Sequence, residues 1–396
     1  MATTLIGEDL AAALHGAVVV ERRSDGIQGW RLRESDRRTA PAALALMSEF
    51  GAGTRLRLRT AATRLTLDVT VTRLLQIGQS VPEAPAPFAV VLAGVALPPV
   101  FTEATAVAVE HLDPVSGRRH FVRSGTGRQR IEVELPISDD AGVERTVEIW
   151  LPHDAATTVH AVEASEPVVA AAPRPSLRWI HHGSSISHGG SAAGPLDPWP
   201  TKAALALGMD GMNLGFGGNA MLDSVVARTI AATPAKLISL KFGINVVGAD
   251  AMRRRAFESA LHNFLDLIRD VQPTTPLVLL TAIACPAVET QPGPIRRGSD
   301  GRIAAAERTV IPDVGALTLE HTRMAVRQVA ADRADDAALW LMEGTELFSE
   351  ADVAQLPDGL HPDTAGHALM ADRFVAAARN PLTPLGQAMA AAAALP

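Results

Sequence analysis

The sequence predicts an α/β protein of two domains, an all-β half followed by a half in which strands and helices alternate. The chain has 396 residues, whereas one domain typically has about 150. Hydrophobic residues follow a period of two in the first half, and short apolar runs alternate with helical patterns in the second. Between the halves, residues 167–175 form a proline-bearing stretch of low complexity that is typical of a linker.

The amino-terminal half is predicted to consist of short antiparallel strands. Across residues 54–74, leucine and valine alternate with arginine and threonine, as in strands with one buried and one solvated face. The same alternation returns at residues 131–135 and 147–151. Several short strands joined by turns predict a β-sandwich of jelly-roll type, which we assign to residues 1–172.

The remaining residues, 173–396, predict a parallel sheet covered by helices. Its strands are expected at five apolar runs, residues 179–180, 212–214, 237–242, 277–282 and 339–342. The clearest helix covers residues 253–270, and one face of it carries the predicted core residues Phe257, Leu261, Phe264, Leu265 and Ile268. The alanine-rich end, from residue 384 onward, is expected to fray.

Composition and charge exclude several classes of partner. The net charge is −7 and no run of lysine and arginine occurs, so we expect no nucleic-acid partner. The longest apolar stretch, residues 89–96, is shorter than the roughly 20 residues of a membrane span. Cys285 is the only cysteine, and Glu8 and Asp9 stand where a secretory signal carries basic residues. A cytoplasmic location without an internal disulfide is therefore predicted.

Two segments carry the residue types of a serine hydrolase. Residues 183–187, Gly-Ser-Ser-Ile-Ser, follow a predicted strand, and a strand-to-helix turn can expose a nucleophilic serine. On this segment alone the alternative, a helix-capping serine, is favoured. Asp358 and His361 lie three residues apart on one loop, so the carboxylate can orient the imidazole toward a hydroxyl. The alternative is a turn with a surface histidine.

Two further segments place glycine and asparagine at strand ends. They are residues 213–219, Asn-Leu-Gly-Phe-Gly-Gly-Asn, and residues 242–245, Phe-Gly-Ile-Asn. Backbone N–H groups and an amide there can converge on an oxyanion, although each segment by itself is also explained by a tight turn. All four segments fall at the carboxyl edge of the predicted sheet, where α/β folds collect their ligand sites. This common position favours a catalytic site.

The four segments resemble the blocks of the SGNH hydrolases, also called the GDSL family, which contribute Ser, Gly, Asn and His in this chain order. The resemblance covers residues 178–378 and implies a flavodoxin-like three-layer α/β/α domain. It implies that Ser185 is the nucleophile and that Asp358 and His361 complete the triad. It also implies that Gly218 and Asn245 are oxyanion donors, together with the backbone N–H of Ser185.

The sequence departs from the family pattern at two positions. Ser184 stands where the family has an aspartate, which leaves Ser184 as the alternative nucleophile, but the match of Gly183 and Ile186 favours Ser185. Val246 replaces a residue that is often polar. A β-rich half before such a domain is similar to two-domain carbohydrate esterases that remove acetyl groups from sugars.

Other reactive side chains are assigned structural roles. His181, His182 and His188 lack the companion ligands of a metal site, so we favour packed or rim histidines. Cys285 has no nearby base in the sequence and is expected to be a buried or loop thiol. The long connection at residues 286–309 is either a substrate-side loop or a mobile one. Its charged residues Glu289, Arg296 and Arg297 are expected to be solvated.

The sequence therefore predicts a serine esterase that hydrolyses a small-acyl, acetyl-type ester of a carbohydrate or other polar small molecule. No cofactor or metal is expected, and the predicted partner is the small-molecule ester. Two alternatives remain open, an acyltransferase with the same triad and an inactive carbohydrate-binding protein. The sequence predicts neither the acyl length nor the oligomeric state.

Overall fold

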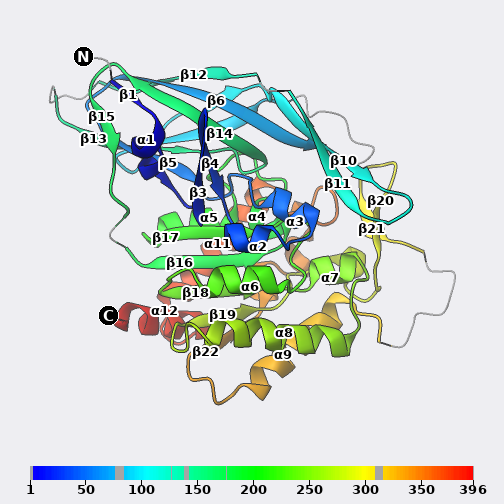
Figure 1. Cartoon of the computed structure of the whole chain (residues 1–396). Coiled ribbons are helices and arrows are strands. Elements are labelled where there is room, and N and C mark those ends of the chain that lie inside the picture. The colour runs from blue at the N-terminus through cyan, green and yellow to red at the C-terminus, as the bar shows by residue number, and fades with distance from the viewer. Residues whose placement is uncertain are drawn as a thin grey trace. The chain divides into compact units, whose positions relative to one another are not determined.

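The computed structural model describes residues 3–75, 84–125, 127–137, 142–174, 176–307 and 315–395. The chain divides into two compact units, Met1–Pro175 with Gly194–Leu196 and Ser176–Ala193 with Asp197–Pro396. Figure 1 shows the elements of both units in chain order. Each unit is described by itself.

The first unit consists mainly of strands. Its elements are β1 (Thr3–Leu5), α1 (Gly7–Ala13), β2 (Leu14–His15), β3 (Val19–Arg23), β4 (Gly26–Trp30), α2 (Glu34–Arg37), α3 (Ala42–Met47), β5 (Arg55–Thr60), β6 (Arg64–Leu75), β7 (Ala86–Leu92), β8 (Val95–Ala96), β9 (Val100–Thr102), β10 (Ala106–Leu112), β11 (Arg119–Ser124), β12 (Gln129–Glu134), β13 (Arg145–Trp150), β14 (Ala155–Ala164) and β15 (Val168–Ala170).

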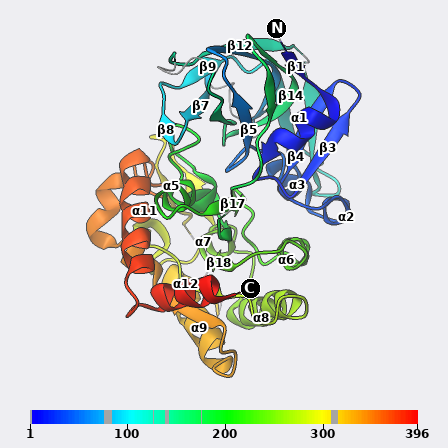
Figure 2. The same cartoon turned by 90° about the vertical axis from the view of Figure 1, so that its left-hand side faces the viewer.

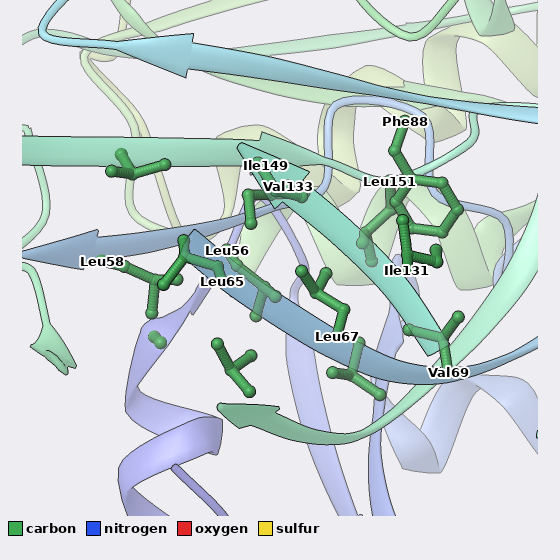
Figure 3. Packing of buried hydrophobic residues seen from close by; sticks show 14 of the residues in the cluster. Leu56, Leu58, Leu65, Leu67, Val69, Phe88, Ile131, Val133, Ile149 and Leu151 are labelled. Atoms are coloured by element: carbon green, nitrogen blue, oxygen red, sulfur yellow. The ribbon is translucent and has the colours of Figure 1, made fainter. Parts of the chain in front are cut away.

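These strands form two sheets that share one hydrophobic core. The first has the order β11-β10-β6-β14-β4-β3, with β1 on β14 and β12 on β6, and the second has the order β15-β5-β13-β7-β8, with β2 on β5 and β9 on β7. Leucines of β5 and β6 and valine and isoleucine side chains of β12 and β13 meet in the core (Figure 3). The period-two pattern predicted this burial because alternate side chains of a strand share a face.

The structure corrects three details of the strand predictions. β10 pairs with β6 in parallel, whereas antiparallel strands were expected. Arg55 and Arg57 of β5 are buried rather than solvated, because Arg57 pairs with Glu148 and Arg55 lies over the Trp150 ring. Within the expected linker, Val168–Ala170 forms β15, which pairs with β5. The jelly-roll connectivity remains a prediction.

The second unit alternates strands and helices. Its elements are β16 (Arg178–Gly183), α4 (Ser185–His188), α5 (Trp199–Ala206), β17 (Asp210–Gly215), α6 (Ser224–Ala231), β18 (Leu237–Lys241), α7 (Ile244–Gly248), α8 (Arg254–Arg269), β19 (Leu277–Leu280), η1 (Pro286–Val288), β20 (Ile295–Arg297), β21 (Ile303–Ala305), α9 (Leu319–Asp332), β22 (Leu339–Met342), α10 (Gly344–Leu347), η2 (Glu350–Gln355), α11 (Thr364–Arg379) and α12 (Pro384–Ala394).

Five of these strands form a parallel sheet in the order β17-β16-β18-β19-β22, as the five apolar runs predicted. This order, 2-1-3-4-5, is that of flavodoxin-like sheets. Trp179 and His182, three positions apart on β16, face opposite layers: the Trp179 ring stacks on Phe374 of α11, and the His182 ring stacks on Phe264 of α8. Figure 2 shows α11 and α8 on the two sides of the sheet. The carboxyl ends of the strands are thereby left for the site.

The helix predicted at residues 253–270 is confirmed as α8, and all five residues assigned to its inner face are buried. The carboxyl-terminal prediction is wrong, since α12 is a packed helix with Leu385 and Ala388 buried. Alanine has the highest helix propensity, and the Thr383 hydroxyl caps the first turn by accepting the N–H of Gly386. Across the described residues, no helix has the length and apolarity needed to cross a membrane.

Candidate active site

Residues 183–187, which we call the nucleophile turn, lie at the end of the strand β16 and the start of α4. Ser184 is the N-cap of α4, and its buried hydroxyl accepts the N–H of Ile186 at 3.3 Å. Ser185 is the first residue of α4 and is half-buried. The capping bond commits Ser184 to the helix and leaves the Ser185 hydroxyl at the carboxyl edge of the sheet.

Ser185, His361 and Asp358 form one hydrogen-bonded chain. Ser185 Oγ lies 2.8 Å from His361 Nε2, and His361 Nδ1 lies 2.8 Å from Asp358 Oδ2. In the tautomer with its proton on Nδ1, the imidazole donates to the carboxylate and accepts from the serine hydroxyl. The structure thus brings together the three residues predicted as a triad, and places Ser185 rather than Ser184 on the histidine.

Asp358 is held by its own loop as well as by the imidazole. Its Oδ1 accepts hydrogen bonds from Leu360 N at 2.9 Å and His361 N at 2.8 Å. Burial alone raises the pKa of Asp358, but the hydrogen bonds from His361 and Leu360 outweigh it and hold this pKa well below its usual range. The carboxylate is therefore ionised at neutral pH and can fix the orientation of the ring.

The two predicted oxyanion residues follow β17 and β18, the strands on either side of β16. Asn245 is the second residue of α7, and its Oδ1 accepts the N–H of Ala220 at 2.9 Å, so its NH₂ group is turned away from Ala220. Gly218 is exposed, has a φ of +70°, and a Cβ there would meet nothing within 4 Å. One hydrogen bond thus joins the loops of Gly218 and Asn245, beside the nucleophile turn.

The nucleophile turn is held by hydrogen bonds that the sequence did not indicate. Ser187 Oγ lies 2.8 Å from Nε2 of the buried His181, and Asn213 Nδ2 donates to Ser187 O at 2.8 Å. A Cβ on Gly183 would lie 2.3 Å from Ser187 Oγ, so the close approach requires glycine. Asn213 lies in a recognisable sequence block, but no local pattern pairs His181 with Ser187.

Gly190 is a second unpredicted residue of the site, and it lies against the His361 ring. A Cβ on Gly190 would be 2.8 Å from His361 Cδ2. The Gly190 carbonyl oxygen lies 3.1 Å from Nε2 of His367, a buried residue of α11. Because Gly190 has no side chain, the His361 imidazole fits beside it. The contact of His367 with the Gly190 oxygen ties this turn to α11.

The remaining histidines and the cysteine have structural contacts. His182 Nδ1 lies 2.7 Å from Leu214 O, and burial lowers the pKa of His181 well below its usual value, so His181 is neutral. In the part of the chain that the structure describes, no group of three His, Cys, Asp or Glu side chains is placed to hold a metal ion. Cys285 is buried, and burial raises the pKa of its thiol to about 11. It is a protonated thiol, unsuited to be a nucleophile.

The long connection at residues 286–309 contains η1 and the hairpin of β20 and β21, and residues 308–309 lie outside the described residues. The expectation of solvated charges is wrong for Glu289, which pairs with Arg323 of α9. Arg296 and Arg297 are exposed as expected. The exposed Arg297 also has a partner in the site, since its Nη2 donates to Asp358 Oδ2 at 3.1 Å.

Residues 182–369, which include all four sequence blocks, match the GDSL-like Lipase/Acylhydrolase family. The chain carries a GDSL/SGNH hydrolase domain. The family resemblance read from the four blocks is confirmed for residues 182–369, and this match supports an ester hydrolase. No curated protein matches the sequence significantly.

Three solved structures are similar to this protein over nearly the whole chain. A salicylyl-acyltransferase from a tetracycline biosynthetic pathway has 23% identity and a TM-score of 0.77, covering 100% of this chain and 98% of its own. A Bacteroides ovatus protein described as a GDSL-like lipase has 16% identity and a TM-score of 0.66, covering 96% and 97%. A family two carbohydrate esterase from Cellvibrio japonicus has 14% identity and a TM-score of 0.58, covering 99% of each chain. At these identities the likeness concerns the fold.

Proposed function

We propose that the chain is a serine esterase that cleaves a small-acyl ester, an acetyl ester of a carbohydrate or another polar small molecule, through an acyl-enzyme on Ser185. One observation carries the proposal, the hydrogen-bonded chain from Ser185 Oγ through His361 to Asp358. This arrangement matches a nucleophile, a general base and the group that orients the base.

The proposed reaction has two halves that use the same base. His361 Nε2 takes the hydroxyl proton as Ser185 Oγ attacks the acyl carbon, and the resulting oxyanion accepts hydrogen bonds from the Asn245 NH₂ group and from Gly218 N and Ser185 N. His361 then gives its proton to the leaving alcohol. Water attacks the acyl-enzyme, again with His361 as base, and releases the acid and the free serine.

The substrate class is supported by the fold likeness to a family two carbohydrate esterase and by a sequence that has a net charge of −7 and no run of lysine and arginine. We expect a neutral or polar small-molecule ester as the partner of the site. The test is a hydrolysis screen of sugar acetates and of nitrophenyl esters of increasing acyl length. Fastest turnover of acetates supports the proposal, whereas a preference for long acyl chains contradicts it.

Acyl transfer is the second candidate, because the likeness with the TM-score of 0.77 is to a salicylyl-acyltransferase. The triad would form the same acyl-enzyme, and an alcohol would resolve it instead of water. Product analysis with and without a sugar acceptor separates the two. Labelling of Ser185 by a fluorophosphonate probe would support either enzymatic function. If the chain only binds carbohydrate, Ser185 would not react with the probe.

A further inference from the structure

The hairpin of β20 and β21 lies apart from the main sheet, within the connection between β19 and α9. Its two strands pair antiparallel, with Ile295 opposite Ala305 and Arg297 opposite Ile303. We call residues 293–306 the clamp hairpin. Its base is closed by a hydrogen bond from Ala306 N to Pro294 O at 2.7 Å.

One side of the clamp hairpin is bonded to the loop of the triad aspartate. Ile303 N donates to the backbone oxygen of Asp358 at 2.7 Å. Arg297 Nη2 donates to Asp358 Oδ2 at 3.1 Å, and Arg297 Nη1 donates to Gly301 O at the hairpin turn. Gly359 has a φ of +84°, and a Cβ there would lie 3.1 Å from Ile303 O. The hairpin therefore holds both the backbone and the side chain of Asp358.

The base of the clamp hairpin packs on α7, the helix that carries Asn245. A Cβ on Gly293 would lie 1.9 Å from Val247 O, so this backbone contact admits no side chain. A Cβ on Gly248 would lie 3.1 Å from Cδ1 of Ile295. The same hairpin thus contacts the helix of a predicted oxyanion donor and the loop of the triad acid.

We propose that the clamp hairpin sets the spacing between α7, which carries Asn245, and the loop that carries Asp358 and His361. We also propose that Arg297 is a positioning residue that acts on the reaction through Asp358. This inference rests on the proposed esterase function. Arg297 and His361 donate to the same carboxylate oxygen, Oδ2. A guanidinium on that oxygen holds the carboxylate plane in the orientation that the imidazole needs.

The charge of Arg297 adds an effect that a purely structural residue lacks. A positive charge beside Asp358 disfavours a second positive charge on His361, so losing Arg297 favours the protonated, inactive imidazole. The Arg297 side chain is 52% exposed, so water weakens this effect. Other titratable groups on elements around this loop are Cys285 and Glu289 beside η1, His188 of α4, Asp300 and Arg302 at the hairpin turn, and Asp363 before α11.

One of these groups, Cys285, keeps its charge state across the pH range of the experiment, and Glu289 has a partner of its own. The Cys285 thiol donates to Gly359 O at 3.4 Å, and its raised pKa of about 11 keeps it neutral. Glu289 is paired with Arg323. Asp358 is the carboxylate to which both Arg297 and His361 donate, so we attribute a change in pH profile on altering Arg297 to the Asp358 and His361 pair.

The experiment compares Arg297→Gln, Arg297→Lys and the control Arg296→Gln in the full chain. Arg296 is exposed and is the neighbouring residue on β20, so its side chain points to the other face of the hairpin. The measurements are kcat and KM for nitrophenyl acetate, the pH dependence of kcat/KM at low and high salt, and the rate of Ser185 labelling by a fluorophosphonate. Circular dichroism checks that each variant is folded.

We expect Arg297→Gln to lower kcat by about ten-fold with KM changed by less than about two-fold. We expect the midpoint of the acidic limb of its kcat/KM profile to shift to a higher pH, by about 0.3 pH unit at low salt and by less at high salt. Arg297→Lys should restore the position of the limb and most of kcat, and Arg296→Gln should match the wild type.

Two results overturn the positioning role while leaving the esterase proposal intact. One is an active wild type with Arg297→Gln indistinguishable from Arg296→Gln. The other is a loss of kcat in Arg297→Gln with an unmoved limb and no rescue by lysine, which indicates a structural contact only. If the wild type hydrolyses no ester and Ser185 is not labelled, the esterase proposal itself fails, and the role of Arg297 fails with it.

Discussion

Ser184 and Ser185 are adjacent in the chain, but their hydroxyls have different partners. The Ser184 hydroxyl is buried and caps α4, whereas the Ser185 hydroxyl bonds His361, which lies 176 residues away in the sequence. A single turn can point only one of two successive side chains at the imidazole.

We predict that Ser185→Ala abolishes turnover, with a loss on the order of 10⁶ in kcat, because the nucleophile is removed. Ser184→Ala should keep a substantial part of the activity, since it loses a helix cap worth about 1 kcal/mol. Initial rates with nitrophenyl acetate measure both. An inactive Ser184→Ala beside an active Ser185→Ala would show that the neighbouring serine attacks.

Asn245 is oriented by its own hydrogen bond from Ala220, so its NH₂ group is fixed before substrate arrives. We predict that Asn245→Ala lowers kcat by about 10² to 10³ with little change in KM, because the donor bonds more strongly to the oxyanion than to the ester. Steady-state kinetics measure the two constants. A change confined to KM would mean that Asn245 binds the ground state instead.

Gly190 has no room for a side chain beside the His361 ring. We predict that Gly190→Ala lowers kcat by about 10², because a displacement of the base by about 1 Å has an effect of this size. Ala193→Ser, at an exposed position of the same loop, is the matched control. Equal activity of Gly190→Ala and the control would show that the ring can move without cost.

At the scale of elements, α11 is fixed to the preceding η2 by an ion pair. Arg373 of α11 donates to both carboxylate oxygens of Asp352 in η2, and Ser349 N and Oγ also bond that carboxylate. The bonds from Arg373 and Ser349 lower the pKa of Asp352 to about 2. Because α11 also holds the Gly190 turn through His367, this ion pair supports the site from a distance.

We predict that Asp352→Asn lowers the free energy of unfolding at pH 7. A carboxyl whose pKa is depressed in the folded state contributes stability above its unfolded pKa of about 3.9, and that contribution is lost as the pH falls through the folded value. The difference between wild type and variant should therefore shrink between pH 4 and pH 2.

Urea unfolding followed by tryptophan fluorescence at pH 7, 4 and 2.5 measures this difference. Asp372→Asn is the matched control, because Asp372 is an exposed acidic residue of α11. A pH-independent difference for Asp352→Asn would mean that its charge contributes nothing and that only the shape of the side chain matters.

At the scale of the whole molecule, all residues with a proposed chemical role belong to the second unit. Ser185, Gly218, Asn245, Asp358 and His361 all follow Gly183. The first unit has its own core between two sheets, and its described residues include none of these groups. The chemistry is thus expected to be complete without residues 1–172.

We predict that the fragment 173–396 hydrolyses nitrophenyl acetate but loses preference for a sugar acetate, since the first unit would contribute specificity and not catalysis. The measurement is kcat/KM of a fragment that circular dichroism shows to be folded, on acetate, butyrate and sugar acetate esters. A folded fragment without activity on any ester would assign part of the chemistry to the first unit.

The sequence by itself determined the parallel α/β sheet, the helix α8 and the four blocks of the site. These features are readable because they are local: the period of the apolar residues gives the element, and a motif places its residues at the end of a strand. The order of four blocks was enough to name Ser185, Asp358 and His361 as a candidate triad, and their hydrogen bonds were found where the blocks predicted them.

Only the tertiary structure decided which side chains meet across long distances in the chain. Arg297 donates to Asp358, which lies 61 residues away in the sequence. Arg57 is buried because its guanidinium donates to Glu148 of the neighbouring strand β13 and to the backbone oxygen of Ala172. The alanine-rich end forms α12 because the sheet offers a surface to pack on. A local pattern shows which face of an element is polar, but burial depends on what packs against that face.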